Sequence, residues 1–361
     1  MTKRHILLTG GGTAGHVMPN IALIDYLQQS ENDWQFSYIG SYSGIESELI
    51  KAHTNIDYHP IACGKLRRYW DWRNFTDPFK VIYGIIQSLY LCRKIKPDVV
   101  FSKGGFVSLP VVIAARLCGI PTLLHESDLS PGLANRLSNR FVKQILLTFE
   151  DSKRYFQSQD KLTVTGLPIR PSLLQGDANK GRQLINEAQD KPIILILGGS
   201  LGAQTINQSV EQALPQLLEQ AHVIHVCGKK QINTELDKQY QHYHPFEYLA
   251  GELPDILAAA DFVISRAGAN TLYELLSLHK PHLLIPLSAR ASRGDQIENA
   301  RHFEKLGYSH VLQQDNLTPD QLTEQVTQGL ANLDNQRQQL QNFKPTPALE
   351  LIEQAINKQL S

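Results

Sequence analysis

The sequence predicts an α/β fold with two doubly wound domains, each a parallel sheet with helices on both faces. Short apolar runs alternate with helical segments along the chain, which is typical of right-handed βαβ units. The two halves begin alike, with an apolar strand, a glycine-rich turn and a helix. A chain of 361 residues is also too long for one ordinary core. We therefore expect two Rossmann-like domains that face each other across a cleft.

The first half begins with HILLT at 5–9, a short apolar run that predicts a buried strand. The glycine-rich turn GGGTAGH follows at 10–16, and then a helix whose apolar stripe starts at Ile21. Later strands of this half are expected at 36–40, 58–62, 98–102 and 122–125, and later helices at 44–50, about 79–95 and 111–118.

The alternation pauses at TVTGLPIRPS, where two prolines and the polar GDANKG indicate a linker, so we expect domains at 1–165 and 166–345. The second half has expected strands at 192–197, 222–228, 246–250, 260–265 and 282–287, with a helix at about 205–219 after the turn GGSLGAQ. The last expected helix, ALELIEQAINKQL, follows no glycine loop. We expect this terminal segment, 346–361, to pack back on the first domain.

Composition disfavours several classes of protein. Lys plus Arg and Asp plus Glu both number 35, so the net charge gives no indication of nucleic-acid binding. The four cysteines are too far apart for a metal-binding pair and too few for a disulfide scaffold, which indicates a reducing compartment. Neither a signal peptide nor an apolar run of about 18 residues is found, so we expect a soluble or peripheral protein.

The segment SRAGANTLYE, 265–274, joins an expected strand to an expected helix. The amides of Ala269 to Thr271 would open that helix, and a helix N-terminus favours a phosphate. Glu274 lies one turn further on, where a carboxylate suits the paired hydroxyls of a ribose. The alternative is a tight turn with a glutamate stabilised by the helix dipole.

Gly10, Gly12 and Gly15 satisfy the dinucleotide pattern GxGxxG at a strand-to-helix junction. A nicotinamide site also needs an acidic residue at the end of the second strand, and here no carboxylate follows until Glu46. The pattern therefore indicates an amide-rich loop that faces the cleft. His16 begins the next helix, where the dipole disfavours the cationic form and leaves a ring that can accept a proton. The alternative is a histidine bonded to the backbone.

Gly198, Gly199 and Gly202 form the matching turn of the second half, and Ser200 offers a hydroxyl to a diphosphate. The turn lacks the lysine of an ATP-hydrolysing loop. Arg170 in the linker is a suitable cation for the same phosphates because its planar fork binds them through two hydrogen bonds, although a linker arginine can also be simply solvated.

The turn HESD, 125–128, places Glu126 and Asp128 after a first-half strand, where either carboxylate could act as a general base. Alternatively, Asp128 or Ser130 caps the following helix. In SRGDQIENA, Asp295 and Gln296 could bind sugar hydroxyls, although Asp295 could be only a first-turn helix charge. No DxD pair occurs, so we expect no metal ion to hold a diphosphate.

The segment KLRRYWDWRNF, 65–75, combines aromatic and basic side chains. Such a mixture suits the surface of an anionic membrane, with single-stranded nucleic acid or a self-packed loop as alternatives. The candidate membrane residues are Lys65, Arg67, Arg68, Trp70, Trp72, Arg73 and Phe75.

Taken in order, the motifs GGGTAGH, SKGGFVSLPVVIAA, HESDLSPGLANR, GLPIR, GGSLGAQ, SRAGANTLYE and SRGDQIENA resemble the MurG family along almost the whole chain. These N-acetylglucosaminyltransferases convert lipid I to lipid II in bacterial peptidoglycan synthesis. The resemblance implies a GT-B fold, with UDP-GlcNAc held mainly by the second domain and lipid I and the membrane contacted by the first. It also implies an inverting reaction without a cofactor or metal, a peripheral location on the cytoplasmic face of the cell membrane, contact with anionic lipids, and contact with proteins of wall synthesis and division.

By motif, the resemblance assigns site residues in both domains. Ser200 and Arg170 look like diphosphate contacts and Glu274 like the ribose ligand. Asp295 and Gln296 look like donor-sugar contacts, and Ala269 and Thr271 like the helix start beneath the phosphates. Thr13, Gly15 and His16 lie in the loop expected to close over the diphosphate and acceptor, with His16 the first candidate for the base and Glu126 or Asp128 behind it.

Three motifs depart from the family's pattern. The loop reads GGTAGH where GGTGGH is usual, HESD replaces HEQN, and GGSLGA replaces GGSQGA. The second change matters most, because Asp128 cannot donate a hydrogen bond as the usual asparagine does. The rival readings are a UDP-GlcNAc 2-epimerase, a nicotinamide oxidoreductase and a noncatalytic sensor of nucleotide sugars.

Overall fold

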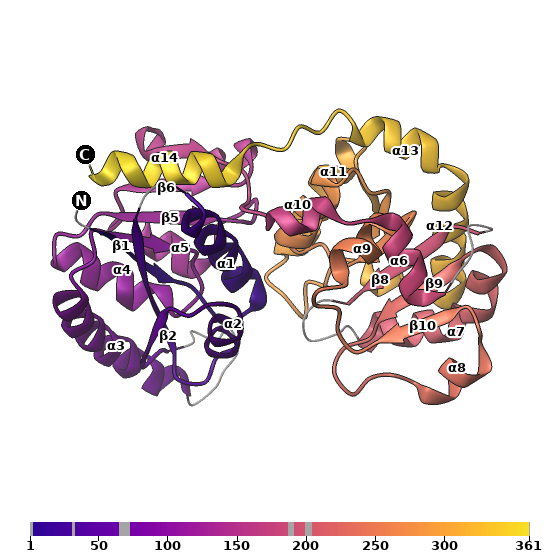
Figure 1. Cartoon of the computed structure of the whole chain (residues 1–361), viewed down its shortest axis with the longest axis horizontal. Coiled ribbons are helices and arrows are strands. Elements are labelled where there is room, and N and C mark those ends of the chain that lie inside the picture. The colour runs from indigo at the N-terminus through magenta and orange to yellow at the C-terminus, as the bar shows by residue number, and fades with distance from the viewer. Residues whose placement is uncertain (1–2, 31–32, 65–72, 187–190, 199–203, 361) are drawn as a thin grey trace. The chain divides into compact units, whose positions relative to one another are not determined.

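The computed structural model describes residues 3–30, 33–64, 73–186, 191–198 and 204–360, with side chains from 76 onward in the third range. The chain divides into two compact units (Figure 1). The first consists of Met1–Arg170 together with Thr346–Ser361, and the second of Pro171–Pro345. The chain therefore passes between the units twice, after Arg170 and before Thr346.

The first unit is a seven-stranded parallel sheet with the order β3-β2-β1-β4-β5-β6-β7. The strands are β1 (Arg4–Thr9), β2 (Trp34–Ser41), β3 (Asp57–Ile61), β4 (Val99–Ser102), β5 (Thr122–Glu126), β6 (Gln144–Leu147) and β7 (Leu162–Val164). The helices are α1 (Ala14–Gln28), α2 (Ile45–His53), α3 (Arg73–Ile95), α4 (Ser108–Leu117), α5 (Leu133–Ser138) and α14 (Ala348–Leu360), with short 3-10 turns at Glu150–Tyr155 and Gln159–Lys161.

Helices cover both faces of this sheet because alternate side chains of each strand point to opposite faces. Ile6 and Leu8 of β1 pack with α1 and with Ile352 and Ile356 of the terminal helix α14. Leu7 packs on the other face, with residues of α3 and α4. The last helix of the chain thus completes the core that the first strand begins.

The second unit is a six-stranded parallel sheet with the order β10-β9-β8-β11-β12-β13. Its strands are β8 (Ile193–Leu197), β9 (His222–Val226), β10 (Tyr243–Phe246), β11 (Phe262–Ser265), β12 (His282–Leu284) and β13 (His310–Val311). Its helices are α6 (Ala178–Ile185), α7 (Gln204–Gln220), α8 (Thr234–Gln239), α9 (Leu253–Ala259), α10 (Ala269–Ser277), α11 (Asp295–Lys305), α12 (Pro319–Ala331) and α13 (Leu333–Leu340), with 3-10 turns at Pro171–Gln175 and Gln314–Asn316.

The same topology recurs in the two units, which confirms the predicted fold class. In each sheet the strand order reverses next to the first strand, between β1 and β4 in one unit and between β8 and β11 in the other. Ligands of doubly wound proteins bind outside the carboxyl ends of the strands at this reversal. The loops that leave β1, β4, β8 and β11 are therefore the places to look for a site.

Some elements differ from the sequence expectations. Strand β10 lies at Tyr243–Phe246, before the expected 246–250, and α3 starts at Arg73, before the expected start at about residue 79. Strands β6, β7 and β13 were not expected. Both β7 and β13 are short edge strands with half-buried residues, so they lack the continuous apolar run that marks a central strand.

Candidate functional site

Two loops meet at the strand reversal of the first unit. The loop after β1 leads into α1, with Thr13 as the N-cap, and Gly12 has a φ of 91°. The amide of Gly11 donates to the carbonyl of Gly104, in the loop after β4, over 3.3 Å. A Cβ at Gly12 would lie 2.7 Å from the ring of Phe106, so only glycine fits.

His16 lies in the first turn of α1 and is half-buried. Its amide donates to the carbonyl of Thr13 over 3.1 Å. A Cβ at Gly105 would lie 3.2 Å from Cδ2 of the His16 ring, so the ring sits beside the second loop. Thr13 is exposed and Gly15 half-buried, and the structure thus brings these three predicted residues together at one edge of the sheet.

A buried lysine that the sequence did not assign to the site, Lys103, directly follows β4 at the same carboxyl ends of the strands. The Nζ of Lys103 contacts Nδ1 of His125 over 3.0 Å and also donates to Oγ of Ser127. Because the lysine donates to Nδ1, the proton of His125 is on Nε2, which donates to the carbonyl of Gly166 over 2.8 Å. Burial lowers the pKa of Lys103 to about 8, although the charges of Glu126 and Asp128 act to raise it. Burial, and to a lesser extent the positive charge of Lys103, hold the pKa of His125 well below its usual value.

Glu126 is buried and holds the loop that follows β5. Its carboxylate accepts hydrogen bonds from the amides of Asp128 (3.0 Å) and Gly132 (3.1 Å) and from Nδ2 of Asn135 (2.8 Å). Three donors on a buried carboxylate favour a structural role over proton transfer. Asp128 is half-buried, and the alternative by which Asp128 or Ser130 caps the following helix is wrong, because the N-cap of α5 is Gly132.

The buried lysine leads to a prediction about stability. Its pKa is about 8 in the folded protein and 10.5 ordinarily, so between these values the unfolded chain keeps a proton that the folded protein has lost. The stability contributed by Lys103 therefore rises with pH across this window. Between about pH 7 and about pH 9.5, we expect the free energy of unfolding of the wild type to rise by about 2 kcal/mol relative to that of the Lys103→Met variant. Denaturant titrations at both pH values measure this difference.

The matched control is Lys143→Met, which removes an exposed lysine of the same unit. It should not change the pH dependence of the unfolding free energy. If Lys103→Met and Lys143→Met show the same pH dependence, the buried amine does not titrate in this window.

In the second unit, the turn after β11 opens α10 as the sequence predicted. Gly268 is the N-cap, Ala269 is buried, and Thr271 and Glu274 are half-buried. A Cβ at Gly268 would meet no described atom within 4 Å, so the space beside this N-cap residue is open among the described residues. Glu274 lies one turn further along α10.

Arg266 was missed, although an arginine directly after a strand end was a signal. Its Nη1 donates to the carbonyl of Ile285 over 3.0 Å and to Oε1 of Gln314 over 2.6 Å. Burial lowers the pKa of Arg266 to about 10. The guanidinium thus joins the carboxyl ends of β11 and β12. Asn299 of α11 fixes the same turn by donating to the carbonyl of Ala267 over 3.3 Å.

The first turn of α11 carries the two predicted sugar contacts. The Oε1 of Gln296 accepts from the amide of Leu287 over 3.1 Å, which leaves its amide nitrogen as the group that could meet a sugar hydroxyl. Asp295 pairs with Arg293, with 3.3 Å between Oδ1 and Nε. Both side chains lie in the second unit at the end of the loop after β12.

The remaining predicted residues are distributed as follows. Arg170 is the last residue of the first unit, where its charge acts on Asp25 of α1. Outside the described residues lie Ser200, Gly199 and Gly202 and the membrane candidates Lys65, Arg67, Arg68, Trp70 and Trp72; the side chains of Arg73 and Phe75 are likewise not described.

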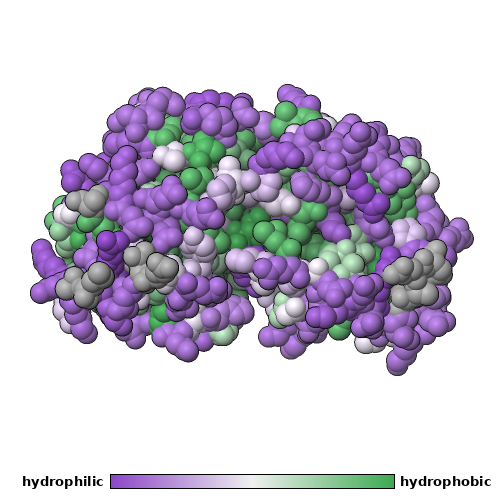
Figure 2. Space-filling model, turned by 45° about the horizontal axis from the view of Figure 1, so that its top comes forward, coloured by the Kyte–Doolittle hydropathy of each residue, from purple (hydrophilic) through white to green (hydrophobic). Residues whose placement is uncertain are grey.

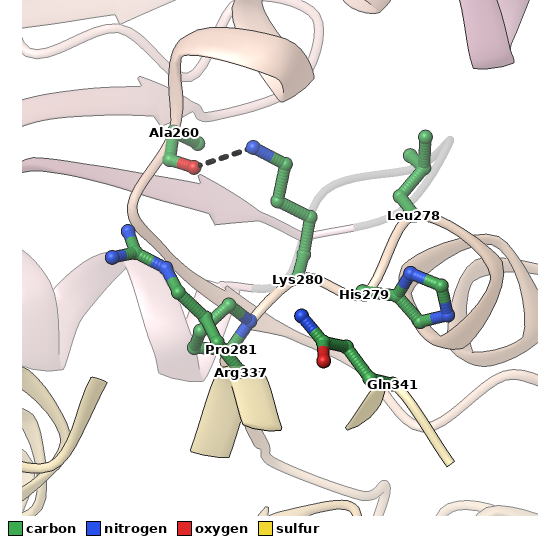
Figure 3. Close-up of a pocket in the computed structure, with 7 residues that line it drawn as sticks. All are labelled: Ala260, Leu278, His279, Lys280, Pro281, Arg337 and Gln341. Carbon is green, nitrogen blue, oxygen red and sulfur yellow. Dashed lines mark hydrogen bonds between the residues drawn. The ribbon is translucent and has the colours of Figure 1, made fainter. Parts of the chain in front are cut away.

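A pocket of about 210 Å³ lies elsewhere in the second unit (Figure 3). It is lined by Ala260, Leu278, His279, Lys280, Pro281, Arg337 and Gln341. The Lys280 amine points to the carbonyl of Ala260, to which it donates over 2.9 Å. Ala260 and Pro281 precede β11 and β12, so this pocket is at the amino ends of the strands, away from the turn at 266–271.

Comparison with known proteins agrees with the two-unit organisation. Residues 6–147 match the N-terminal domain of glycosyltransferase family 28, and residues 193–355 match its C-terminal domain. Over 354 residues the chain is 51% identical to UDP-N-acetylglucosamine--N-acetylmuramyl-(pentapeptide) pyrophosphoryl-undecaprenol N-acetylglucosamine transferase of Legionella pneumophila (strain Paris), covering 98% of this chain and 96% of that protein.

Two further comparisons point the same way. A Bacillus anthracis protein of that name, numbered 2, is 48% identical over 349 residues, or 97% of this chain and 98% of the relative. Among solved structures, Acinetobacter baumannii MurG matches with a TM-score of 0.75 at 27% identity, over 98% of this chain and 99% of that one. The chain therefore belongs to glycosyltransferase family 28 and, within it, to the MurG family.

Proposed function

We propose that this protein transfers N-acetylglucosamine from UDP-N-acetylglucosamine to the C4 hydroxyl of N-acetylmuramic acid in lipid I, which yields lipid II and UDP. The observation that carries the proposal is the first turn of α10. Among the described residues this helix start has open space beside Gly268, and Glu274 follows one turn later. A diphosphate suits the helix start and a ribose suits the carboxylate. Family membership supplies the identity of both substrates.

We assign the donor to the second unit and the acceptor to the first. Ser200 and Arg170 are proposed diphosphate contacts, while Ala269 and Thr271 supply the helix start beneath the phosphates. Gln296, with Asp295 beside it, is proposed to contact the donor sugar. Thr13, Gly15 and His16 are proposed to meet the acceptor, because the structure brings them together at the strand reversal of the first unit.

In the proposed reaction, the C4 oxygen attacks C1 of N-acetylglucosamine from the face opposite the diphosphate, so the configuration at C1 inverts. The bond from the C4 oxygen to C1 forms as the bond from C1 to the diphosphate oxygen breaks, and both electrons of the broken bond leave with UDP. His16 takes the proton of the C4 hydroxyl. The positive end of α10 and Arg170 stabilise the charge that develops on UDP. Glu126 instead holds the 127–135 loop, and Asp128 remains a second candidate for the base.

The function is tested by incubating the protein with labelled UDP-N-acetylglucosamine, a lipid-linked MurNAc-pentapeptide and EDTA. We expect label to appear in the lipid-linked disaccharide and UDP to be released in equal amount. Binding of UDP-N-acetylglucosamine without transfer of label would contradict the proposed function. Formation of UDP-N-acetylmannosamine, or of free N-acetylmannosamine with UDP, would identify an epimerase.

We further propose that the first unit binds an anionic membrane surface through α3. No helix in the described ranges is both long and apolar enough to span a bilayer. Instead, one face of α3 exposes large apolar side chains at helical spacing: Phe79, Ile82, Tyr83, Ile86 and Tyr90. The exposed cations Arg93, Lys94 and Lys96 follow at its end. Figure 2 shows a face of the molecule on which hydrophilic residues predominate, with smaller hydrophobic areas between them. A row of large exposed apolar side chains on one helix face, followed by cations, is typical of an interaction surface.

This proposal predicts weaker membrane binding when the α3 stripe is made polar. Ile82 and Ile86 are 56% and 57% exposed, and each would bury apolar area in a lipid headgroup region. We expect the double change Ile82→Ser with Ile86→Ser to weaken binding to phosphatidylglycerol vesicles at least about tenfold. Vesicle sedimentation measures the partition coefficient.

The control is Leu184→Ser with Leu306→Ser, two second-unit side chains that are 50% and 52% exposed. It removes similar apolar area away from α3 and should leave vesicle binding unchanged. Equal losses in both double variants, or none in either, would argue against α3 as the membrane-binding face.

A further inference from the structure

Glu46 of α2 is fully buried (0% exposed) against the glycine-rich loop of the first unit. Its Oε2 accepts a hydrogen bond from the amide of Gly12 over 3.1 Å. Its Oε1 accepts from the amide of Ser41 over 3.1 Å and from Oγ of the same serine. The carboxylate thus joins one donor from the loop after β1 to two donors from Ser41, the last residue of β2.

The glycines on both sides of this carboxylate make room for it. A Cβ at Gly11 would lie 2.6 Å from Cδ of Glu46, and a Cβ at Gly44 would collide with the same carboxylate. Glycine at both positions therefore admits the glutamate side chain into the loop. Since the three hydrogen-bonded donors compensate the buried charge, the carboxylate is held in one position.

This arrangement reverses the usual use of such a loop. In nucleotide-binding proteins, the amides of a glycine-rich loop bind the phosphates of the ligand. Here the amide of Gly12 binds the protein's own carboxylate and the amide of Gly11 binds the carbonyl of Gly104. The part of the loop left to face a substrate begins at Thr13 and ends at His16.

We propose that Glu46 is a positioning residue for the transfer reaction, which holds Gly12 at its positive φ and thereby places Thr13 and His16 against the acceptor. The inference rests on the proposed function, because it takes the first unit as the acceptor side. Glu46 itself touches no substrate. Its removal therefore affects acceptor kinetics and leaves the donor site in the second unit intact.

The test compares Glu46→Gln with Glu48→Gln, an exposed carboxylate two residues away on the same helix. In the first variant an amide NH₂ faces a backbone donor, so one hydrogen bond to a charged group is lost and a repulsive contact replaces it. We expect kcat/KM for the lipid-linked acceptor to fall roughly 10- to 100-fold, with KM for UDP-N-acetylglucosamine unchanged. Glu48→Gln should behave as the wild type.

A second readout does not depend on transferase activity. Amide hydrogen exchange of the peptide that contains residues 10–16 should be faster in Glu46→Gln than in Glu48→Gln. Ser41→Ala removes only the hydroxyl donor and should show the same two effects to a smaller extent, which keeps the test open if Glu46→Gln does not fold. Wild-type exchange and acceptor kinetics in a folded Glu46→Gln or Ser41→Ala variant would overturn the role of Glu46. A wild-type protein that transfers no label but shows the exchange difference would instead count against the proposed function alone.

Discussion

Replacing His16 by alanine is expected to lower kcat for transfer by about 10²- to 10⁴-fold, the usual contribution of a general base. The imidazole sits in the first turn of α1 beside the loop after β4, which we assign to the acceptor side. Since the donor is assigned to the other unit, KM for UDP-N-acetylglucosamine should stay close to the wild-type value. Steady-state kinetics at saturating acceptor measure both quantities.

The control for this experiment is His53→Ala, which removes an exposed histidine from α2 of the same unit. This variant should have the kcat of the wild type. Near-normal turnover by a folded His16→Ala variant would exclude His16 as the base and make Asp128 the next residue to replace.

Glu274→Ala is expected to raise KM for UDP-N-acetylglucosamine roughly 10- to 100-fold, with a smaller change in kcat. The carboxylate is one turn into α10, and hydrogen bonds between a charged group and the ribose hydroxyls contribute about 1.5–3 kcal/mol. This energy acts in the ground state and the transition state alike, so it changes KM more than kcat. Calorimetric titration of UDP measures the same loss as a weaker Kd.

Glu219→Ala is the matched control, because this exposed glutamate is near the end of α7, which leads to the amino end of β9. It should leave KM and Kd unchanged. An unaltered Kd for UDP in Glu274→Ala would refute the assignment to the ribose.

Local signals in the sequence were sufficient for much of the fold and for the helix start that we propose as part of the donor site. The apolar run 5–9 and the turn that follows it predicted β1 and the start of α1. A buried parallel strand is a continuous apolar run, so it can be identified from its own residues without knowledge of the neighbouring strands. The motif SRAGANTLYE likewise placed Ala269 and Thr271 at a helix start and Glu274 one turn later.

Contacts between distant segments could not be predicted in this way. In the sequence, Glu46 was considered only as a carboxylate that lies too far beyond the second strand to bind the ribose of a nicotinamide cofactor. Its hydrogen bond to Gly12 forms because β1 and β2 are neighbours in the sheet. The Lys103 pair with His125 likewise depends on the adjacency of β4 and β5. The exposed stripe of α3 was missed because the same spacing also fits a buried helix face.

The return of α14 to the first unit has a consequence for how the protein is made. Ile352, Ala355 and Ile356 belong to the core that begins with β1, so the first unit remains incomplete until residues 348–360 leave the ribosome. At roughly 5–20 residues per second, synthesis of the intervening second unit takes on the order of ten seconds or more. The second unit, which is one continuous stretch, can therefore finish folding first, although it is encoded later.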